Sequence, residues 1–224
     1  MSHISRRAAV RQALFPTMIL GTLMAMGQEN PPPAGYHEHD GFFLSMGLGP
    51  LTASYDDKVS GNAPFAGSTL TFSGWGALFD VRIGGSIGTN LILSGDLIGR
   101  SLVEPKLEIN GGGSATLEDV TFTEALVGAG LTYYLMPENI FFSATLGLSN
   151  ISLDYYRSGT RVTGTTDTGF GVNVKVGKEW WVGDDWALGI AGSGSWMSLT
   201  NKPSGATEDF TGYSFSVQFS ATYH

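Results

Sequence analysis

Tyr213-Ser-Phe-Ser-Val-Gln-Phe-Ser-Ala-Thr-Tyr223 alternates apolar or aromatic residues with small polar ones over its whole length. Successive side chains of a β-strand point to opposite faces, so this stretch has one apolar face and one polar face. About 9 to 11 tilted residues are enough for a strand to cross a bilayer. The stretch therefore predicts a membrane-crossing strand whose apolar face meets lipid.

Seven earlier segments show the same two-faced pattern. In one of them, Trp75, Phe79 and Val81 share a face opposite Asp80 and Arg82. Eight such segments predict an all-β fold, an eight-stranded antiparallel up-and-down transmembrane β-barrel. The predicted strands are Gly41 to Tyr55, Ser68 to Ile83, Leu91 to Val103, Thr121 to Leu135, Ile140 to Tyr155, Thr168 to Val182, Trp186 to Thr200 and Thr211 to Tyr223.

The connections between these segments alternate in length. Gly84 to Asn90, Met136 to Asn139 and Gly183 to Asp185 are short, whereas the others are long and polar. Short turns of bacterial outer-membrane barrels face the periplasm, so both ends of the barrel are expected there. Aromatic residues are expected to form two interfacial girdles. The periplasmic girdle comprises Phe42, Phe79, Tyr133, Phe142, Trp180, Trp186 and Tyr223, and the outer girdle Tyr55, Trp75, Tyr155, Trp196 and Tyr213.

The N-terminal part of the chain differs from the rest. Three arginines precede an apolar run that ends in small residues, so residues 1–27 predict a cleaved secretory signal peptide. Arg6-Arg7 also permits a twin-arginine interpretation, but an exported barrel must cross unfolded, which favours ordinary secretion. Residues 28–40 include three consecutive prolines and predict a flexible segment, and residues 41–224 form the barrel domain.

Composition excludes several classes of protein. Without residues 1–27 the chain has 9 basic and 20 acidic residues, and this net charge of −11 disfavours binding to nucleic acid. Cysteine is absent, so we expect neither disulfides nor a lipid-anchored cysteine. No apolar window of 18 residues occurs after the signal, which excludes a helical span there.

A set of charged residues falls on the face opposite the apolar one. The interior of an eight-stranded barrel is just wide enough to be filled by side chains, and an isolated buried charge is costly. These residues therefore predict a salt-bridged plug in the lumen, with a narrow gated ion path as the alternative. They are Asp80, Arg82, Asp96, Arg100, Glu124, Lys175 and Glu179.

Catalytic and metal-binding patterns are weak. Outside the signal, the histidines are His37, His39 and His224, and none lies in a predicted strand. A nucleophile with a positioned base is not recognisable, so we expect no enzyme activity and no cofactor. His37-Glu38-His39-Asp40 is the most metal-like stretch, but a solvated linker explains it as well, and we predict no specific metal site.

From about residue 41 to 224 the chain resembles the eight-stranded outer-membrane β-barrel family typified by the OmpA membrane domain and OmpX. The resemblance rests on strand count, loop asymmetry and the closing strand Tyr213 to Tyr223. It implies an outer-membrane location in a Gram-negative bacterium, contact with outer-membrane lipid, and recognition by the barrel-assembly machinery through Phe219 and Tyr223. Family members usually end on an aromatic residue, whereas here His224 follows Tyr223. A related barrel that deacylates lipid A carries a His-x-Ser on a late strand, which this chain lacks.

The leading functional prediction is a monomeric barrel with a structural or surface-interaction role. Tyr156, Arg157, Arg161 and Phe210 are loop residues that could contact lipopolysaccharide or an extracellular partner. One alternative is a small transport or ligand-carrying barrel with a narrow channel. Another is a soluble lipocalin-type barrel, in which the apolar face points inward.

Overall fold

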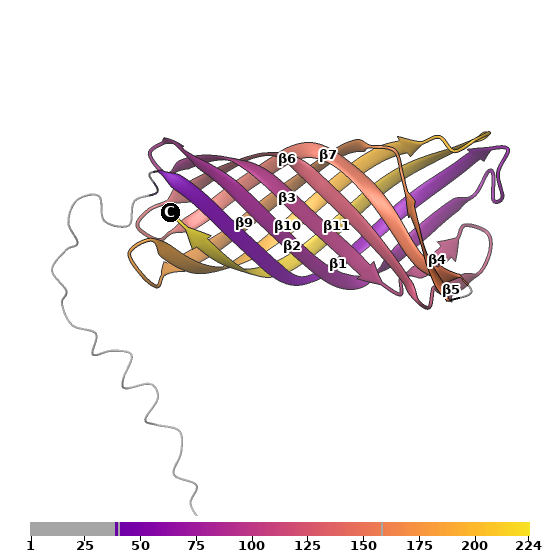
Figure 1. The fold of residues 1–224 in the computed structure, drawn as a ribbon, viewed down its shortest axis with the longest axis horizontal. Coiled ribbons are helices and arrows are strands. Elements are labelled where there is room, and N and C mark those ends of the chain that lie inside the picture. The colour runs from indigo at the N-terminus through magenta and orange to yellow at the C-terminus, as the bar shows by residue number, and fades with distance from the viewer. Residues whose placement is uncertain (1–38, 40, 158) are drawn as a thin grey trace, which may run out of the picture. The chain divides into compact units, whose positions relative to one another are not determined.

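Eight long strands form a closed antiparallel barrel in the computed structural model, which describes residue 39, residues 41–157 and residues 159–224 (Figure 1). Each strand pairs with its neighbours in chain order, and the pairing of the first strand with the last closes the barrel. This confirms the predicted fold class. The strands are β1 (Phe42–Gly61), β2 (Thr69–Gly88), β3 (Leu91–Val103), β6 (Val120–Leu135), β7 (Ile140–Arg157), β9 (Gly169–Trp181), β10 (Trp186–Asn201) and β11 (Ala206–Tyr223).

The last strand closes the barrel as its alternation predicts. Tyr223 is opposite Leu44 of β1 on one side and Trp186 of β10 on the other. Along β11, Phe215 is 67% exposed whereas the neighbouring Ser216 is buried. The polar face of this strand therefore points into the lumen.

The outer wall carries a broad belt of exposed apolar side chains. Trp75, Phe215 and Phe219 are each at least 65% exposed, and they lie on strands from different parts of the chain. Exposed apolar surface of this extent is typical of a lipid-facing barrel wall. The soluble lipocalin-type interpretation is therefore wrong, because it requires the apolar face to point inward. Among the residues that the structure describes, no helix is long and apolar enough to cross a membrane.

Three short strands extend the end of the barrel opposite the short turns (Figure 1). β4 (Lys106–Ile109) pairs with β2 and with β5 (Ser114–Thr116), and β8 (Thr160–Thr165) pairs with β7. β1 also continues past its predicted end to Gly61, and only residues 202–205 separate β10 from β11. Much of the sequence predicted as long loops is therefore hairpin extension, held by backbone hydrogen bonds. β2 is extended at the other end of the barrel, to Gly88, so the predicted short connection Gly84 to Asn90 is wrong for most of its length.

The short connections lie together at the other end of the barrel, which the length rule assigns to the periplasm. Lys178 lies on the lipid-facing side of β9 near this end. Its ammonium donates a 2.7 Å hydrogen bond to the carbonyl of Glu138 in the β6–β7 turn and lies 5.8 Å from the ring centroid of Trp180. The turn thus provides a polar partner for this lysine at the edge of the apolar belt.

Candidate functional site: the lumen and its two mouths

The seven charged residues predicted to face the lumen all point inward, and each is at most 5% exposed. The structure separates them into three groups along the barrel. Asp80, Arg82, Asp96 and Lys175 form a central cluster, Arg100 and Glu124 form a pair nearer the outer mouth, and Glu179 lies at the periplasmic mouth.

The central cluster bridges opposite walls of the barrel. Lys175 on β9 donates hydrogen bonds to Asp80 on β2 (2.6 Å) and to Gln218 on β11 (3.1 Å). The Nε atom of Arg82 lies 3.7 Å from a carboxylate oxygen of Asp80 and 3.9 Å from one of Asp96. Two cations therefore face two carboxylates in a buried cluster that spans the bore.

Small residues of β6 and β7 complete the surroundings of this cluster. Ser143 accepts a 2.5 Å hydrogen bond from Arg82, and Thr145 donates one of 2.5 Å to Asp96. Gly130 leaves the space that the Asp96 carboxylate occupies, because a Cβ atom at this position would overlap the carboxylate oxygen. Alanine at position 130 would displace Asp96 from the cluster.

In the pair nearer the outer mouth, both carboxylate oxygens of Glu124 accept hydrogen bonds. Arg100 donates to Glu124 and to Asn173, both at 2.8 Å. Glu124 accepts further hydrogen bonds from Tyr55 (2.8 Å) and Ser149 (3.1 Å). The prediction that Tyr55 belongs to the outer aromatic girdle is wrong, because its side chain is 1% exposed and points into the lumen.

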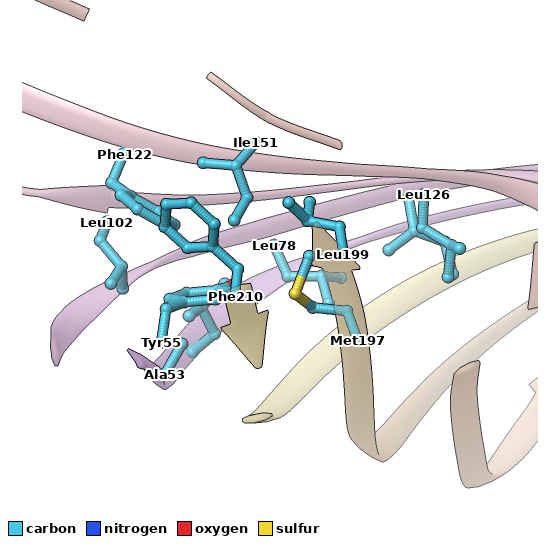
Figure 2. Packing of buried hydrophobic residues seen from close by; sticks show 12 residues of the cluster. Ala53, Tyr55, Leu78, Leu102, Phe122, Leu126, Ile151, Met197, Leu199 and Phe210 are labelled. Atoms are coloured by element: carbon cyan, nitrogen blue, oxygen red, sulfur yellow. The ribbon is translucent and has the colours of Figure 1, made fainter. Parts of the chain in front are cut away.

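An apolar cluster surrounds this outer pair, with contributions from seven barrel strands. Figure 2 shows Tyr55, Phe122 and Phe210 meeting from different walls. The lumen is thus lined by charged residues in its middle and largely by apolar residues toward the outer mouth, a division that the sequence-based prediction of a charged interior missed. The cluster consists of Leu51, Ala53, Tyr55, Leu78, Ile98, Leu102, Phe122, Leu126, Ile151, Met197, Leu199 and Phe210.

Two histidines close the periplasmic mouth. His39 precedes β1 and is 1% exposed, with its ring stacked on Tyr134 at a centroid distance of 3.6 Å. Its Nε2 lies 2.8 Å from Oδ1 of Asn139, and its Nδ1 lies 2.9 Å from Nδ1 of His224, which follows β11. The other ring nitrogen of His224 lies 3.4 Å from Glu179. Sequence analysis left both histidines outside the strands and so missed this contact.

We expect the pKa of the His39 imidazole to lie far below that of an ordinary histidine. Burial, followed by the nearby His224 ring, lowers the pKa of His39 from 6.5 to about 4, although Asn139 and Glu179 oppose the shift. Because the folded-state pKa is depressed, the stabilisation by His39 is fully present above about pH 6.5 and is lost as the pH falls through 4. An NMR pH titration that follows the imidazole signals of His39 in the barrel in nanodiscs measures this pKa directly.

His39→Phe is the matched variant for this prediction, because it keeps a stacked ring without a titrating nitrogen. Between pH 6.5 and 4 the unfolding temperature of the parent barrel should fall relative to that of H39F. A His39 pKa near 6.5, or an unchanged difference between the two unfolding temperatures, contradicts the buried position of His39.

The described bonds of the two histidine rings run to Asn139, to each other and to Glu179. Within the described part of the chain, no group of three His, Cys, Asp or Glu side chains is arranged to hold a metal ion. His37 and Asp40 of the metal-like stretch lie outside the described residues.

The residues predicted as the assembly signal lie on the lipid-facing side of β11. Phe219 is 65% exposed. The ring of Tyr223 lies 6.2 Å from that of Phe42 and 5.4 Å from that of Trp186, so the seam between β1, β11 and β10 is aromatic at the periplasmic rim. Recognition by the assembly machinery stays a prediction.

The loop residues proposed to contact a partner occupy different environments. Tyr156 is 64% exposed near the outer end of β7, and Arg161 on β8 forms a 3.0 Å ion pair with Asp154. Arg157 ends β7. The placement of Phe210 in a loop is wrong, because it lies within β11 and packs in the apolar cluster at 7% exposure.

Comparison with known proteins gives fold likeness only. No family model and no curated protein matches the sequence. Among solved structures, Neisserial surface protein A is 14% identical over 82% of this chain and 96% of that chain, with a TM-score of 0.49. Outer membrane protein OprG from Pseudomonas aeruginosa is 12% identical over 83% and 98% (TM-score 0.47). Outer membrane protease OmpT from Escherichia coli is 12% identical over 83% and 97% (TM-score 0.46). None of these proteins transfers an activity, ligand or partner to this chain.

The molecule itself has the architecture of an eight-stranded outer-membrane barrel. Its strands close through β1 and β11, its wall is apolar, and short turns and longer hairpins occupy opposite ends.

Proposed function

We propose that this chain is an outer-membrane barrel with a closed lumen, which acts as a structural or surface-interaction protein through its outer hairpins. The observation that carries the proposal is the burial along β3. The six inward-facing side chains of this strand, from Ile92 to Leu102, are each at most 6% exposed. Because β3 runs through the apolar belt, a continuous water column in the bore would expose at least some of them.

The energetic cost of moving an ion through the bore also favours a closed barrel. An ion moving through the bore would have to separate Lys175 from Asp80, and to pass the apolar side chains around Arg100 and Glu124. Separating a buried ion pair leaves an uncompensated charge in a low-dielectric interior. The charged residues therefore support a plug more strongly than a narrow ion path.

Planar-bilayer recording tests the closed lumen. We expect no sustained single-channel conductance after incorporation of the purified, folded barrel, because the inward-facing side chains of β3 are buried along the whole strand. Bilayers that receive the same detergent without protein are the control. Sustained steps that scale with incorporated protein would instead favour the transport alternative.

Fractionation with a heat-modifiability gel tests the location. We propose that a signal peptide directs export and that the barrel-assembly machinery inserts the chain, so the mature barrel should co-fractionate with the outer membrane and migrate faster before boiling than after it. A chain that is freely soluble without detergent contradicts this part of the proposal. Lipopolysaccharide and extracellular proteins are the partners proposed for the outer hairpins.

A further inference from the structure

A pocket of about 320 Å³ lies at the outer mouth, above the apolar cluster. It is small for a ligand site but within the usual range. Phe72, Phe122, Phe210, Ile151 and Leu153 give it an apolar and partly aromatic surface. Three of these residues also belong to the apolar cluster, so the pocket is closed from below by packed side chains.

One side of the pocket is acidic. Asp57 lies on the outer extension of β1, opposite Phe210 of β11, and lines the pocket together with Glu208. No lysine, arginine or histidine is among the described residues that line this pocket. Glu208 accepts a 2.7 Å hydrogen bond from Asn201, a neutral group that leaves its charge uncompensated.

Asp57 is the unusual member of this acidic side. Asp57 is only 4% exposed, and its Oδ1 atom is buried without a hydrogen-bond partner among the described residues. A buried carboxylate oxygen without a donor is costly, and folded proteins rarely leave one unless a ligand, ion or water supplies the partner. The missing partner here is a hydrogen-bond donor within an apolar pocket.

The surroundings of Asp57 indicate that the donor is cationic. Burial raises the pKa of Asp57 from 3.8 to about 7, and the charges of Glu208 and Asp209 add to the shift. Asp209 itself accepts a hydrogen bond from Thr200, and Lys58, the neighbour of Asp57 on β1, is exposed on the opposite face of the strand. A cation bound beside Asp57 would neutralise this local excess of negative charge.

We propose that the outer-mouth pocket binds a small organic cation, in which a protonated amine is joined to an aromatic or apolar group. The amine donates to Asp57 and faces Glu208, and the apolar group packs on Phe72, Phe122 and Phe210. Cations are also attracted to aromatic faces, which strengthens the preference for an ammonium over a neutral group of similar size. The site lies outside the plugged lumen, so it requires no passage through the barrel.

Binding of 2-phenylethylamine to the full barrel in nanodiscs tests this proposal. Isothermal titration calorimetry at pH 8 should show saturable binding, and 2-phenylethanol and 3-phenylpropionate should bind at least about tenfold more weakly, because they lack the charge-assisted hydrogen bond. Empty nanodiscs measure partition of the ring into lipid. Lowering the pH to 6 should weaken amine binding, because Asp57 then holds a proton.

Two variants test whether the amine binds beside Asp57. Asp57→Asn should lose at least about tenfold in amine affinity, whereas Asp154→Asn, which changes an acidic residue of β7 that is paired with Arg161, should leave it unchanged. Heat-modifiability confirms that both variants are folded. Equal affinity for the amine and the alcohol, no saturable binding of the amine, or unchanged affinity of D57N overturns the proposal. The conductance measurement is independent of this result, so a closed lumen can stand without the ligand site.

Discussion

Arg100→Met is expected to lower the free energy of unfolding by about 3–5 kcal/mol. The substitution removes the guanidinium that neutralises Glu124 and leaves that carboxylate buried at 1% exposure. It also removes the donor to Asn173. Urea-induced unfolding in lipid vesicles, followed by tryptophan fluorescence, measures the change under conditions where refolding is reversible.

Two further variants show whether this loss comes from the unpaired charge. Arg161→Met breaks an exposed pair with Asp154 and should change the unfolding free energy far less than R100M does, because solvent screens exposed ion pairs. The double variant Arg100→Met/Glu124→Leu replaces both charges by apolar groups within an apolar cluster, so it should regain much of the stability lost in R100M. Equal losses in R100M and R161M would show that the buried pair is not as isolated from solvent as the structure places it.

Phe122→Ala is expected to cost about 3–5 kcal/mol, because it removes a buried aromatic ring from a packed cluster. The ring of Phe122 lies 4.6 Å from that of Tyr55 and 5.3 Å from that of Phe72, and the residue is 2% exposed. The vacated volume would join the outer-mouth pocket, since Phe122 lines it. The same urea titration reports the loss of stability.

Phe65→Ala is the matched control for this prediction. Phe65 lies in the connection between β1 and β2 and is 56% exposed, so the same change of side chain should alter the unfolding free energy by no more than about 0.5 kcal/mol. A loss in F122A as small as that in F65A would mean that the outer half of the lumen is loosely packed.

The lipid-facing residues of the strands were predictable because lipid imposes one strict rule. Every strand must present apolar residues on alternate positions, and β11 does so from Tyr213 to Tyr223 without interruption. The inward positions obey no such rule. They must only fill the bore, and both Leu102 and its inward neighbour Arg100 do so. Charges on the inward face could therefore be named from the sequence, whereas their division into three groups depends on how the strands are staggered around the barrel.

Tyr55 and Phe210 show where the sequence was ambiguous. Both lie near predicted strand ends, where β1 and β11 continue outward as a paired extension. Aromatic residues at strand ends suit a membrane interface as well as an interior, and only the register of β1 against its neighbours turns Tyr55 toward Glu124. The contact between the two histidines could not be predicted from the sequence for a different reason. His39 and His224 are 185 positions apart, and only barrel closure brings them together.

Because of that separation in sequence, the His39–His224 contact depends on closure of the barrel. His39, three residues before β1, and His224, directly after β11, can meet only when the seam between these two strands is in place. A contact between residues so distant in sequence carries a large loop-closure entropy cost, and the closed barrel has already met that cost through the pairing of β1 with β11. The histidine contact therefore stabilises the closed barrel over an open, partly paired sheet. Its formation reports completion of the barrel.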